Sequence, residues 1–550
     1  LAGWPNGEYT GLIKPIDSNE YGKRTKSGIA NGCSFKVNYD RPSQWSKPEQ
    51  AWLSGTIGPN YEFDYYPVSR FDSKEKRVYL SRGALEKYYT EPYYRFENVP
   101  EELDEPGEYY IDRQSGMLYF YPPEDAPKDS VLTITMSTPT LDVSRKAPNS
   151  MFRIENSKNI VFENLIFKGG RGSAITGKNN SNTKFINCEI NSFGENGIRF
   201  DASTDITISD CKIHDVGQDG ILFVSCGNYQ TLSPSNIVVS NNDIYNFARL
   251  ERSYKTGIDF GYRCVGATAA NNHIHNGPHA GMIFYGVNND IYGNEFDHLV
   301  TEFSDMDALY PWERGNKIHN NYFHDIGKSS MNGRHQINVR AIRTDNRGCG
   351  LNIYENLFYN IGDGGNGNGN NGIGAITAEG TRNRIFNNLF VDCNEAYFNT
   401  LQYKEIETAD DGTLYPDTII NSSGVEVANT INGAKVADLK KQMEKYLPVY
   451  GKQFPELYNY FYEHPNMSKT NEFKNNMIIN ISIPLSNFNG TQNEEGFRGS
   501  QMLTAASGNY VSTSDPGFVS YDNGNLELSS SATSLVEGLP KFEMSSFGIQ

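Results

Sequence analysis

The chain has 550 residues and is acidic, with 66 Asp and Glu against 49 Lys and Arg and a formal net charge of −17. This excess of negative charge argues against nucleic acid as a partner, because basic surface supplies most of that affinity. The sequence contains no apolar run of about 18 residues, the length that a transmembrane helix needs, so no membrane partner is expected.

Residues 1–150 form the first predicted unit. They do not repeat, they are rich in Tyr, Pro and Trp, and they contain β-like runs such as KRVYLS and MLYFYP. The turn-rich segment DEPGEYYIDRQSG lies between these two runs. We predict a β-rich accessory domain, for which a structural role is the simplest interpretation.

A short motif recurs through the second unit, residues 151–400. Its copies read FENLIF, FINCEI, ISDCKI, VSNNDI, ATAANNHI, IYGNEF, IHNNYF, IYENLF and IFNNLF. Copies 22 to 35 residues apart, with alternating apolar residues and Gly/Asn turns, are typical of coils of three short parallel strands. The predicted fold class is therefore all-β, a right-handed parallel β-helix.

Asparagine occupies one position of this motif in six copies, two residues before the motif closes. We expect their amides to hydrogen-bond from coil to coil as a ladder. The six are Asn242, Asn272, Asn294, Asn321, Asn356 and Asn388. Cys188 and Cys211 hold the same position in earlier coils and are predicted to be stacked, buried thiols rather than a disulfide or a metal site.

A second strand of each coil aligns on a small residue, as in NGIRFD, TGIDFG, AGMIFYG, DALYPW, RAIRTD and GAITAEG. The next residue is always apolar and is predicted to point inward, whereas the second and fourth residues after the small one face outward. In the later coils this outward face is rich in carboxylates, Arg and aromatic residues. Neighbouring coils lie about 4.8 Å apart, so these side chains should form one surface.

Two further units complete the predicted organisation. Residues 401–472 interrupt the repeat, carry a helical pattern over 435–446, and are expected to shape one wall of a groove. The repeat resumes at FKNNMI, and residues 473–550 are predicted to form the final coils and a C-terminal cap.

Carboxylates on the outward face are the candidates for chemistry. Glycoside hydrolysis uses two carboxyl groups, one on either side of the scissile bond. Asp345 and Glu379 occupy the same position on successive coils, Glu313 lies one place further along on the preceding coil, and Asp305 and Asp307 precede their strand. One exposed acid alone is usually only a solvated surface residue, so the grouping is what indicates a site.

Aromatic and histidine side chains lie near these acids. Tyr285, Tyr310 and Trp312 belong to the same predicted face, and aromatic rings are natural platforms for the apolar faces of sugars. His279 directly precedes an outward-facing strand and is the best site candidate among the histidines, most of which are expected in turns or within the motif.

Four arginines lie within 14 residues, in the segment NGRHQINVRAIRTDNRG. They are Arg334, Arg340, Arg343 and Arg347. Such a cluster either binds a uronate carboxylate or a sulfate, or forms ion pairs with the adjacent acids, and the sequence leaves both interpretations open.

Several segments together resemble a large group of bacterial right-handed β-helix carbohydrate-active proteins. They are LAGWPNGEY, AWLSG, YRFENVPEELDEPGEYYIDRQSGMLYFYPP, PHAGMIFYG, EFSDMDALY and DPGFV. Within that group the chain is similar to glycoside hydrolase family 141, which includes α-L-fucosidases and xylanases. Asp305 falls on the Asp of the group's ETSDAGAIY-like pattern, and Asp345 falls on the second member of a later aspartate pair, whose first member is replaced by Thr344.

The resemblance implies a glycoside hydrolase that acts on a plant or algal cell-wall polysaccharide or oligosaccharide by carboxylate acid/base catalysis. We predict that the catalytic residues are Asp345, Asp305 and Glu313. The predicted substrate-binding residues are His279, Tyr285, Tyr310, Trp312, Arg343 and Glu379.

The pairing of the acids stays open. On a straight strand, Asp305 and Asp345 would lie roughly 20 Å apart, whereas a catalytic pair needs about 5 to 9.5 Å. Either the chain before Ala308 curls over the groove, or Asp345 works with Glu313 or Glu379.

Two other functions remain as alternatives. One is a polysaccharide lyase that neutralises a uronate with Arg or Lys; Ca²⁺ is a cofactor only in that case, and the sequence has no calcium-loop motif. The other is a noncatalytic glycan-binding protein, because fold does not fix function. For the hydrolase we expect no cofactor or metal site, a monomer, and a secreted or periplasmic location. Related proteins have a further β-helix segment before the position of Leu1, so the chain is expected to be a processed form or a fragment.

Overall fold

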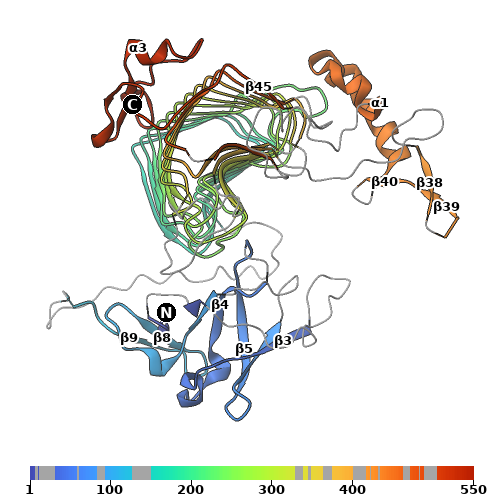
Figure 1. Cartoon of the computed structure of the whole chain (residues 1–550). Coiled ribbons are helices and arrows are strands. Elements are labelled where there is room, and N and C mark those ends of the chain that lie inside the picture. Colours follow the sequence, from blue (N-terminus) through green and yellow to red (C-terminus); the bar gives the residue numbers. More distant parts are fainter. Residues whose placement is uncertain are drawn as a thin grey trace.

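The computed structural model describes most of the chain. The described residues are 1–6, 10–11, 31–58, 61–82, 93–124, 126, 150–328, 338–344, 348–362, 374–378, 380–399, 416–421, 423–431, 434–462, 471–481, 483–487 and 504–550. They form a stack of coils with a separate sheet domain, made by the first part of the chain, beside it (Figure 1).

The N-terminal domain is an antiparallel sheet with the strand order β1-β7-β4-β5-β6-β3, and β2 also pairs with β7. The strands are β1 Gly3–Trp4, β2 Thr10–Gly11, β3 Asn31–Lys36, β4 Trp52–Thr56, β5 Asp64–Asp72, β6 Arg77–Arg82 and β7 Tyr93–Glu97. A hairpin of β8 (Tyr109–Asp112) and β9 (Met117–Phe120) follows. Along β6 the buried Val78 and Leu80 alternate with more exposed residues, the pattern of a sheet with one covered face.

Three parallel sheets of 11 strands form the coil stack, and each coil contributes one strand to each sheet. The first sheet contains β10 Ser150–Glu155, β13 Ser173–Lys178, β16 Ile198–Asp201, β19 Ile221–Val224, β22 Ile258–Phe260, β25 Met282–Phe284, β28 Met306–Pro311, β31 Val339–Thr344, β34 Gly374–Ala378, β37 Glu395–Asn399 and β44 Ile483–Asn487. The second sheet contains β11 Lys158–Glu163, β14 Ser181–Ile186, β17 Thr204–Ser209, β20 Val238–Ser240, β23 Thr268–Ala270, β26 Asp290–Tyr292, β29 Lys317–His319, β32 Asn352–Tyr354, β35 Arg384–Phe386, β42 Asn471–Lys474 and β45 Thr504–Ser507. The third sheet contains β12 Ile166–Gly170, β15 Glu189–Phe193, β18 Lys212–His214, β21 Asp243–Tyr245, β24 His273–Gly277, β27 Glu295–Leu299, β30 Tyr322–His324, β33 Leu357–Tyr359, β36 Leu389–Val391, β43 Met477–Ile479 and β46 Tyr510–Ser512.

The predicted all-β fold, a parallel β-helix, is confirmed, and so is the inward-pointing column of the first sheet. The residues of that column pair with one another in register from coil to coil and are buried: Ile198, Ile221, Ile258, Met282, Leu309, Ile342 and Ile376. The outward column next to it is covered in the later coils. It contains Ile283, Tyr310 and Arg343, each of which is 5% exposed or less.

The asparagine ladder is also confirmed. Each amide nitrogen donates to the side-chain oxygen of the next member, as from Asn294 to Asn321 at 2.9 Å and from Asn321 to Asn356 at 3.0 Å. A second ladder lies five residues earlier in some of the same coils, where side-chain oxygens accept from backbone nitrogens one coil away. Its members include Asn289, Asn316, Asn383 and Asn471. Buried amides are stabilised only when they are paired, so both ladders fix the stacking of coils.

The two cysteines at the ladder position stack as predicted. Both are buried and free, and the Cys188 backbone nitrogen donates to Cys211 Sγ at 3.4 Å.

Two segments pack against the sides of the stack (Figure 1). The insertion after β37 contains the helix α1, Val436–Gln453, which runs beyond the predicted end at residue 446. The tail after β46 forms β47 (Phe518–Ser520), β48 (Asn525–Leu528) and α3 (Ser530–Thr533), and it packs against outward residues of the third sheet, such as Leu389 and Met477. Among the described residues, no helix combines the length and the apolar character that crossing a bilayer requires.

Candidate functional site

The predicted site residues that the structure describes lie on the first sheet or in the turns that enter and leave its strands β25, β28 and β31. Seven of the nine can be placed in the structure: Asp305, Glu313, His279, Tyr285, Tyr310, Trp312 and Arg343. Asp345 and Glu379 lie outside the described residues. The roles assigned to these two remain predictions.

Arg343 organises the start of the site. Its Nη1 donates to Asp305 Oδ1 at 2.7 Å, and its Nη2 donates to the Asp305 backbone oxygen at 3.1 Å. Its Nε lies 2.9 Å from Asp307 Oδ2. Asp305 and Asp307 therefore share one guanidinium.

The two carboxylates differ in exposure. The Asp307 side chain is fully enclosed, whereas 38% of the Asp305 side chain is exposed. Asp305 also accepts from the Asn338 amide, and its backbone has a φ of 58°, a left-handed conformation that is uncommon for residues other than Gly. Asp305 is thus an accessible carboxylate held in one orientation.

Arg340, a second member of the arginine cluster, forms an ion pair inside the protein. It is fully buried, its Nη2 lies 3.1 Å from Glu395 Oε2, and its Nε donates to Thr377 Oγ1 at 2.5 Å. Arg340 and Arg343 therefore form internal ion pairs, one of the two interpretations that the sequence left open. Arg334 and Arg347 lie outside the described residues.

His279 is fully buried beside this cluster. Its Nδ1 accepts from the Tyr254 backbone nitrogen at 3.2 Å, so the neutral ring carries its proton on Nε2. The rings of Tyr254 and Phe303 lie edge-on to it at 5.1 and 5.0 Å. A direct contact between His279 and a sugar, as predicted, therefore requires these rings to move.

His279 should make the protein sensitive to acid. Burial first, and then the charge of Arg343, lower its pKa from 6.5 to about 3. Below pH 6.5 the unfolded chain binds a proton that the folded protein does not, so stability is lost as the pH falls from 6.5 toward 3. We expect this residue alone to lower the free energy of unfolding by roughly 3 kcal/mol at pH 4.

Urea unfolding at pH 7 and pH 4 measures this effect. His279→Gln should lose less stability than the unmodified protein over the same interval. Equal losses in both proteins would show that His279 does not control the acid response.

The N-terminal domain contacts the turns around this cluster. Phe63 donates its backbone nitrogen to Ser253 Oγ at 2.6 Å, and its ring lies 6.3 Å from that of Phe303. The Tyr93 hydroxyl donates to the Glu302 backbone oxygen at 3.1 Å. The accessory domain therefore holds the chain that leads into Asp305.

A track of rings continues from Arg343 along the face of the sheet. The Arg343 guanidinium carbon lies 5.8 Å from the ring centre of Tyr310. Tyr310 lies 5.6 Å from Trp312, and Trp312 lies 5.1 Å from Tyr285. These four predicted residues are thus brought together in one line of contacts.

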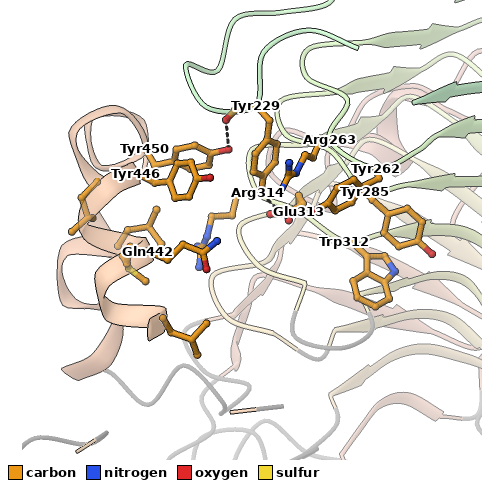
Figure 2. A pocket seen from close by; sticks show the side chains of 14 residues that line it. Tyr229, Tyr262, Arg263, Tyr285, Trp312, Glu313, Arg314, Gln442, Tyr446 and Tyr450 are labelled. Atoms are coloured by element: carbon orange, nitrogen blue, oxygen red, sulfur yellow. Dashed lines mark hydrogen bonds between the residues drawn. The ribbon is translucent and has the colours of Figure 1, made fainter. Parts of the chain in front are cut away.

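The track leads into a pocket of about 580 Å³ between the coils and the insertion. Figure 2 shows α1 as one wall and the side chains from the coils as the other. The lining is Tyr229, Tyr262, Arg263, Tyr285, Trp312, Glu313, Arg314, Leu439, Gln442, Met443, Tyr446, Leu447, Tyr450 and Leu457. Helix α1 is held in place by the Tyr450 hydroxyl, which donates to the Tyr229 backbone oxygen at 2.8 Å (Figure 2).

Glu313 is the carboxyl group of this pocket. The Tyr229 hydroxyl donates to its Oε1 at 3.1 Å. Burial raises the pKa of Glu313 above its usual value, against the opposing effects of Tyr229 and Arg314. Glu313 is separated from Asp305 by the six residues of β28, about 20 Å of extended chain, so the structure does not bring these two predicted acids together.

The sequence did not predict that two buried carboxyl groups, those of Asp219 and Asp259, lie near each other. Asp219 lies just before β19, Asp259 lies on the neighbouring strand β22, and Lys255 Nζ is 3.6 Å from Asp219 Oδ2. Burial raises the pKa of Asp219 to about 6 despite the charge of Lys255, and burial together with the charge of Asp219 raises that of Asp259. Asp219 precedes the small residue of its strand, as Asp307 does, and this shared position is the pattern that could have identified it.

At the Arg343 cluster the described carboxylates already have arginine partners, which is not the oxygen-only coordination that Ca²⁺ prefers. The calcium expected for the lyase alternative thus has no described ligand set there. Groups of His and carboxylate residues that could hold a metal occur on the third sheet.

A family model agrees with the fold, and three solved structures are similar to parts of the chain. A family described as a right-handed β-helix region matches residues 143–248, less than half of the chain. No curated protein sequence matches it. A solved structure described as a glycoside hydrolase is similar with a TM-score of 0.44 and 13% identity, over 72% of this chain and 78% of that one. A family 6 polysaccharide lyase from Pseudopedobacter saltans is similar with a TM-score of 0.35 and 12% identity, over 71% and 99%. A tailspike protein from Pseudomonas phage LKA1 has a TM-score of 0.17 and 10% identity, over 72% and 63%.

Proposed function

We propose that the chain is a glycoside hydrolase that cleaves a plant or algal cell-wall polysaccharide or oligosaccharide. One observation carries the proposal. An accessible carboxylate, Asp305, is fixed by Arg343 at one end of a track of aromatic rings that leads into a large pocket.

Asp305 suits the role of nucleophile or water-activating base. As the ion-pair partner of Arg343 it is a carboxylate, the form that both roles require. Asp307 is enclosed, so it supports Arg343 rather than contacting a substrate. The geometry assigns no proton donor: Glu313 lies beyond the six residues of β28 from Asp305, and Asp345 lies outside the described residues, so its catalytic role stays a prediction from the sequence.

The pocket suits the binding of sugar rings. Tyr285 and Trp312 line it with aromatic surface, on which the apolar face of a sugar can stack. Glu313 adds a carboxyl group to the same pocket, and burial raises its pKa.

Trp312→Ala should weaken substrate binding more than catalysis. Loss of one stacked ring is worth about 0.5–1.5 kcal/mol, so we expect KM to rise by up to about tenfold with a small change in kcat. Steady-state kinetics on a cleaved oligosaccharide measure both constants. Tyr119→Ala is the control, since Tyr119 is exposed on β9 in the N-terminal domain. Unchanged KM in Trp312→Ala would contradict a sugar-binding role for the pocket.

A polysaccharide lyase is the second candidate, and Arg263 is the observation that favours it. This residue lines the pocket, its guanidinium carbon lies 4.6 Å from the Tyr262 ring centre, and it has no carboxylate partner among the residues that the structure describes. A guanidinium in that position could neutralise a uronate carboxylate.

Product analysis tests the proposal and separates the alternatives. The protein is incubated with polysaccharides that contain fucose, xylose, galactose or uronate. Saturated products with new reducing ends support a hydrolase, and an unsaturated uronide that absorbs ultraviolet light supports a lyase. Glycan binding without product formation supports a noncatalytic protein and overturns the enzymatic proposal.

A polysaccharide substrate also bears on location, because such a polymer does not cross a membrane unaided. We propose that the protein is secreted or periplasmic, acts as a monomer, and needs no cofactor for hydrolysis.

A further inference from the structure

The outer face of the third sheet carries a dense group of histidines and carboxylates, far along the coil from the aromatic pocket. Two columns run across the strands β21, β24 and β27. One column contains Asp243, His273 and Glu295, and the other contains Tyr245, His275 and Asp297.

Strand geometry explains why the two histidines lie together. His273 and His275 flank Ile274, which points into the coil and is buried, so both imidazoles project from the same face. Their rings stack with centres 4.0 Å apart and planes 14° apart. Parallel pairing then places Asp243 of the previous coil directly beside His273.

These three side chains converge. One ligand atom of each residue, from Asp243, His273 and His275, lies within 4.8 Å of the others. His275 Nε2 is 3.0 Å from Asp243 Oδ1. Rotation of the two imidazoles out of their stack would aim one nitrogen of each at a shared point beside Asp243, at the distances of about 2.0–2.2 Å at which Zn²⁺ binds nitrogen and oxygen.

The donor set selects the kind of ion. Two imidazole nitrogens and one carboxylate oxygen suit Zn²⁺ and other divalent first-row transition metals. Ca²⁺ and Mg²⁺ prefer oxygen ligands alone.

The surrounding residues supply the outer contacts that metal-binding histidines usually have. His273 Nε2 lies 2.5 Å from Asp297 Oδ2, which leaves Nδ1 for a metal. His275 Nδ1 lies 2.9 Å from the side-chain amide of Asn276, and its Nε2 lies against Asp243 Oδ1. An ion bound here would therefore replace the contact between His275 Nε2 and Asp243 Oδ1 by bonds from both groups to the metal.

The strands that carry the three residues are rigid, and the three side chains are accessible to an ion. The Tyr245 ring stacks on His275 at 5.0 Å, and the backbone belongs to a continuous parallel sheet. The Asp243, His273 and His275 side chains are 18–27% exposed. An ion can thus enter and retain water at an open position.

We propose that Asp243, His273 and His275 bind one divalent first-row transition-metal ion, with Zn²⁺ as its probe. The ion would link two successive coils of the third sheet and stabilise their stacking. This site is separate from the proposed hydrolytic site, so its test does not depend on any enzymatic activity.

The experiment uses the whole chain without a histidine tag, stripped with a chelator and titrated with zinc chloride by calorimetry. We expect one Zn²⁺ per chain with a dissociation constant of micromolar or below. His273→Gln and His275→Gln should each weaken binding at least tenfold. Co²⁺ provides a second readout, since its visible absorption changes when imidazole and carboxylate coordinate it.

His319→Gln is the matched control. His319 Nε2 lies 2.9 Å from Asp290 Oδ1 and its ring stacks on that of Tyr354, so it reproduces the His–Asp pair and the ring contact. It belongs to no three-ligand group among the described residues. This variant should bind Zn²⁺ like the unmodified protein.

Two results would overturn the proposal: no Zn²⁺ binding by the unmodified chain, or binding that both histidine variants retain in full. If a histidine variant fails to fold, Asp243→Asn replaces it, because the amide keeps the shape of the side chain and removes the anionic ligand. Full affinity in that folded variant would also overturn the proposal.

Discussion

Replacing Asp305 with Asn should reduce turnover of a cleaved glycan by about 10²–10⁴-fold, the usual contribution of a general base, and by more if the residue is the nucleophile. The change preserves shape and removes the charge, so the accessible oxygen facing the substrate can no longer accept a proton or attack a sugar carbon. The neighbouring Asp307 still pairs with Arg343, so the fold should persist. Initial rates at saturating substrate and circular dichroism measure the two effects.

Asp201→Asn is the matched control for this experiment. Asp201 lies on the same sheet in an earlier coil, and both of its oxygens are 3.1 Å from Arg199 nitrogens, so the variant also removes one carboxylate from an arginine pair. It should keep full activity. Full activity in Asp305→Asn would refute the assignment of Asp305. A loss of activity in both variants would show that removing any carboxylate from this sheet lowers turnover, so the effect would not be specific to Asp305.

Replacing Asn321 with Leu should destabilise the β-helix by about 3–5 kcal/mol. The fully buried Asn321 amide donates to the backbone oxygens of Ile291 and His319 and to the Asn356 side chain. Its oxygen accepts from both the backbone and the side-chain nitrogen of Asn294. Leu fills a similar volume but leaves these buried groups without a partner, and chemical unfolding followed by circular dichroism measures the loss.

Asn187→Gly is the control for the ladder. Asn187 is exposed, has a φ of 49°, and makes a side-chain bond to Asn164 in the neighbouring coil. Gly accepts that backbone conformation, so the change should cost less than about 1 kcal/mol. Similar losses of stability in both variants would show that the buried position of the ladder does not determine how much it stabilises the protein.

Much of the fold was predictable because β-helix structure is periodic. The repeat predicted the strand triplets, the inward column that includes Ile258 and Leu309, and the amide ladder. The second ladder was not predicted, although Asn289 and Asn316 each precede a residue of the first ladder by five positions. In other coils that position holds Ala267 or Leu351, so the pattern is broken in the sequence.

Less of the site was predictable. The alternation of strand faces correctly predicted that four outward residues lie together: Tyr285, Tyr310, Trp312 and Arg343. The sequence did not show that Arg343 pairs with Asp305, because that contact joins the turn before β28 to the far end of β31. The separation of Glu313 from Asp305 likewise depends on β28 running straight between them.

The coil, its register and the residues that share a face follow from the amino-acid sequence, because alternation along strands and stacking at a fixed spacing are local, repeating constraints. Which of those residues are accessible became clear only in the folded chain. Burial depends on segments that do not repeat: the N-terminal domain against the turn at Phe303, and α1 against Tyr229. The docking of such segments follows from the sum of many weak contacts between distant parts of the chain, which no local pattern encodes.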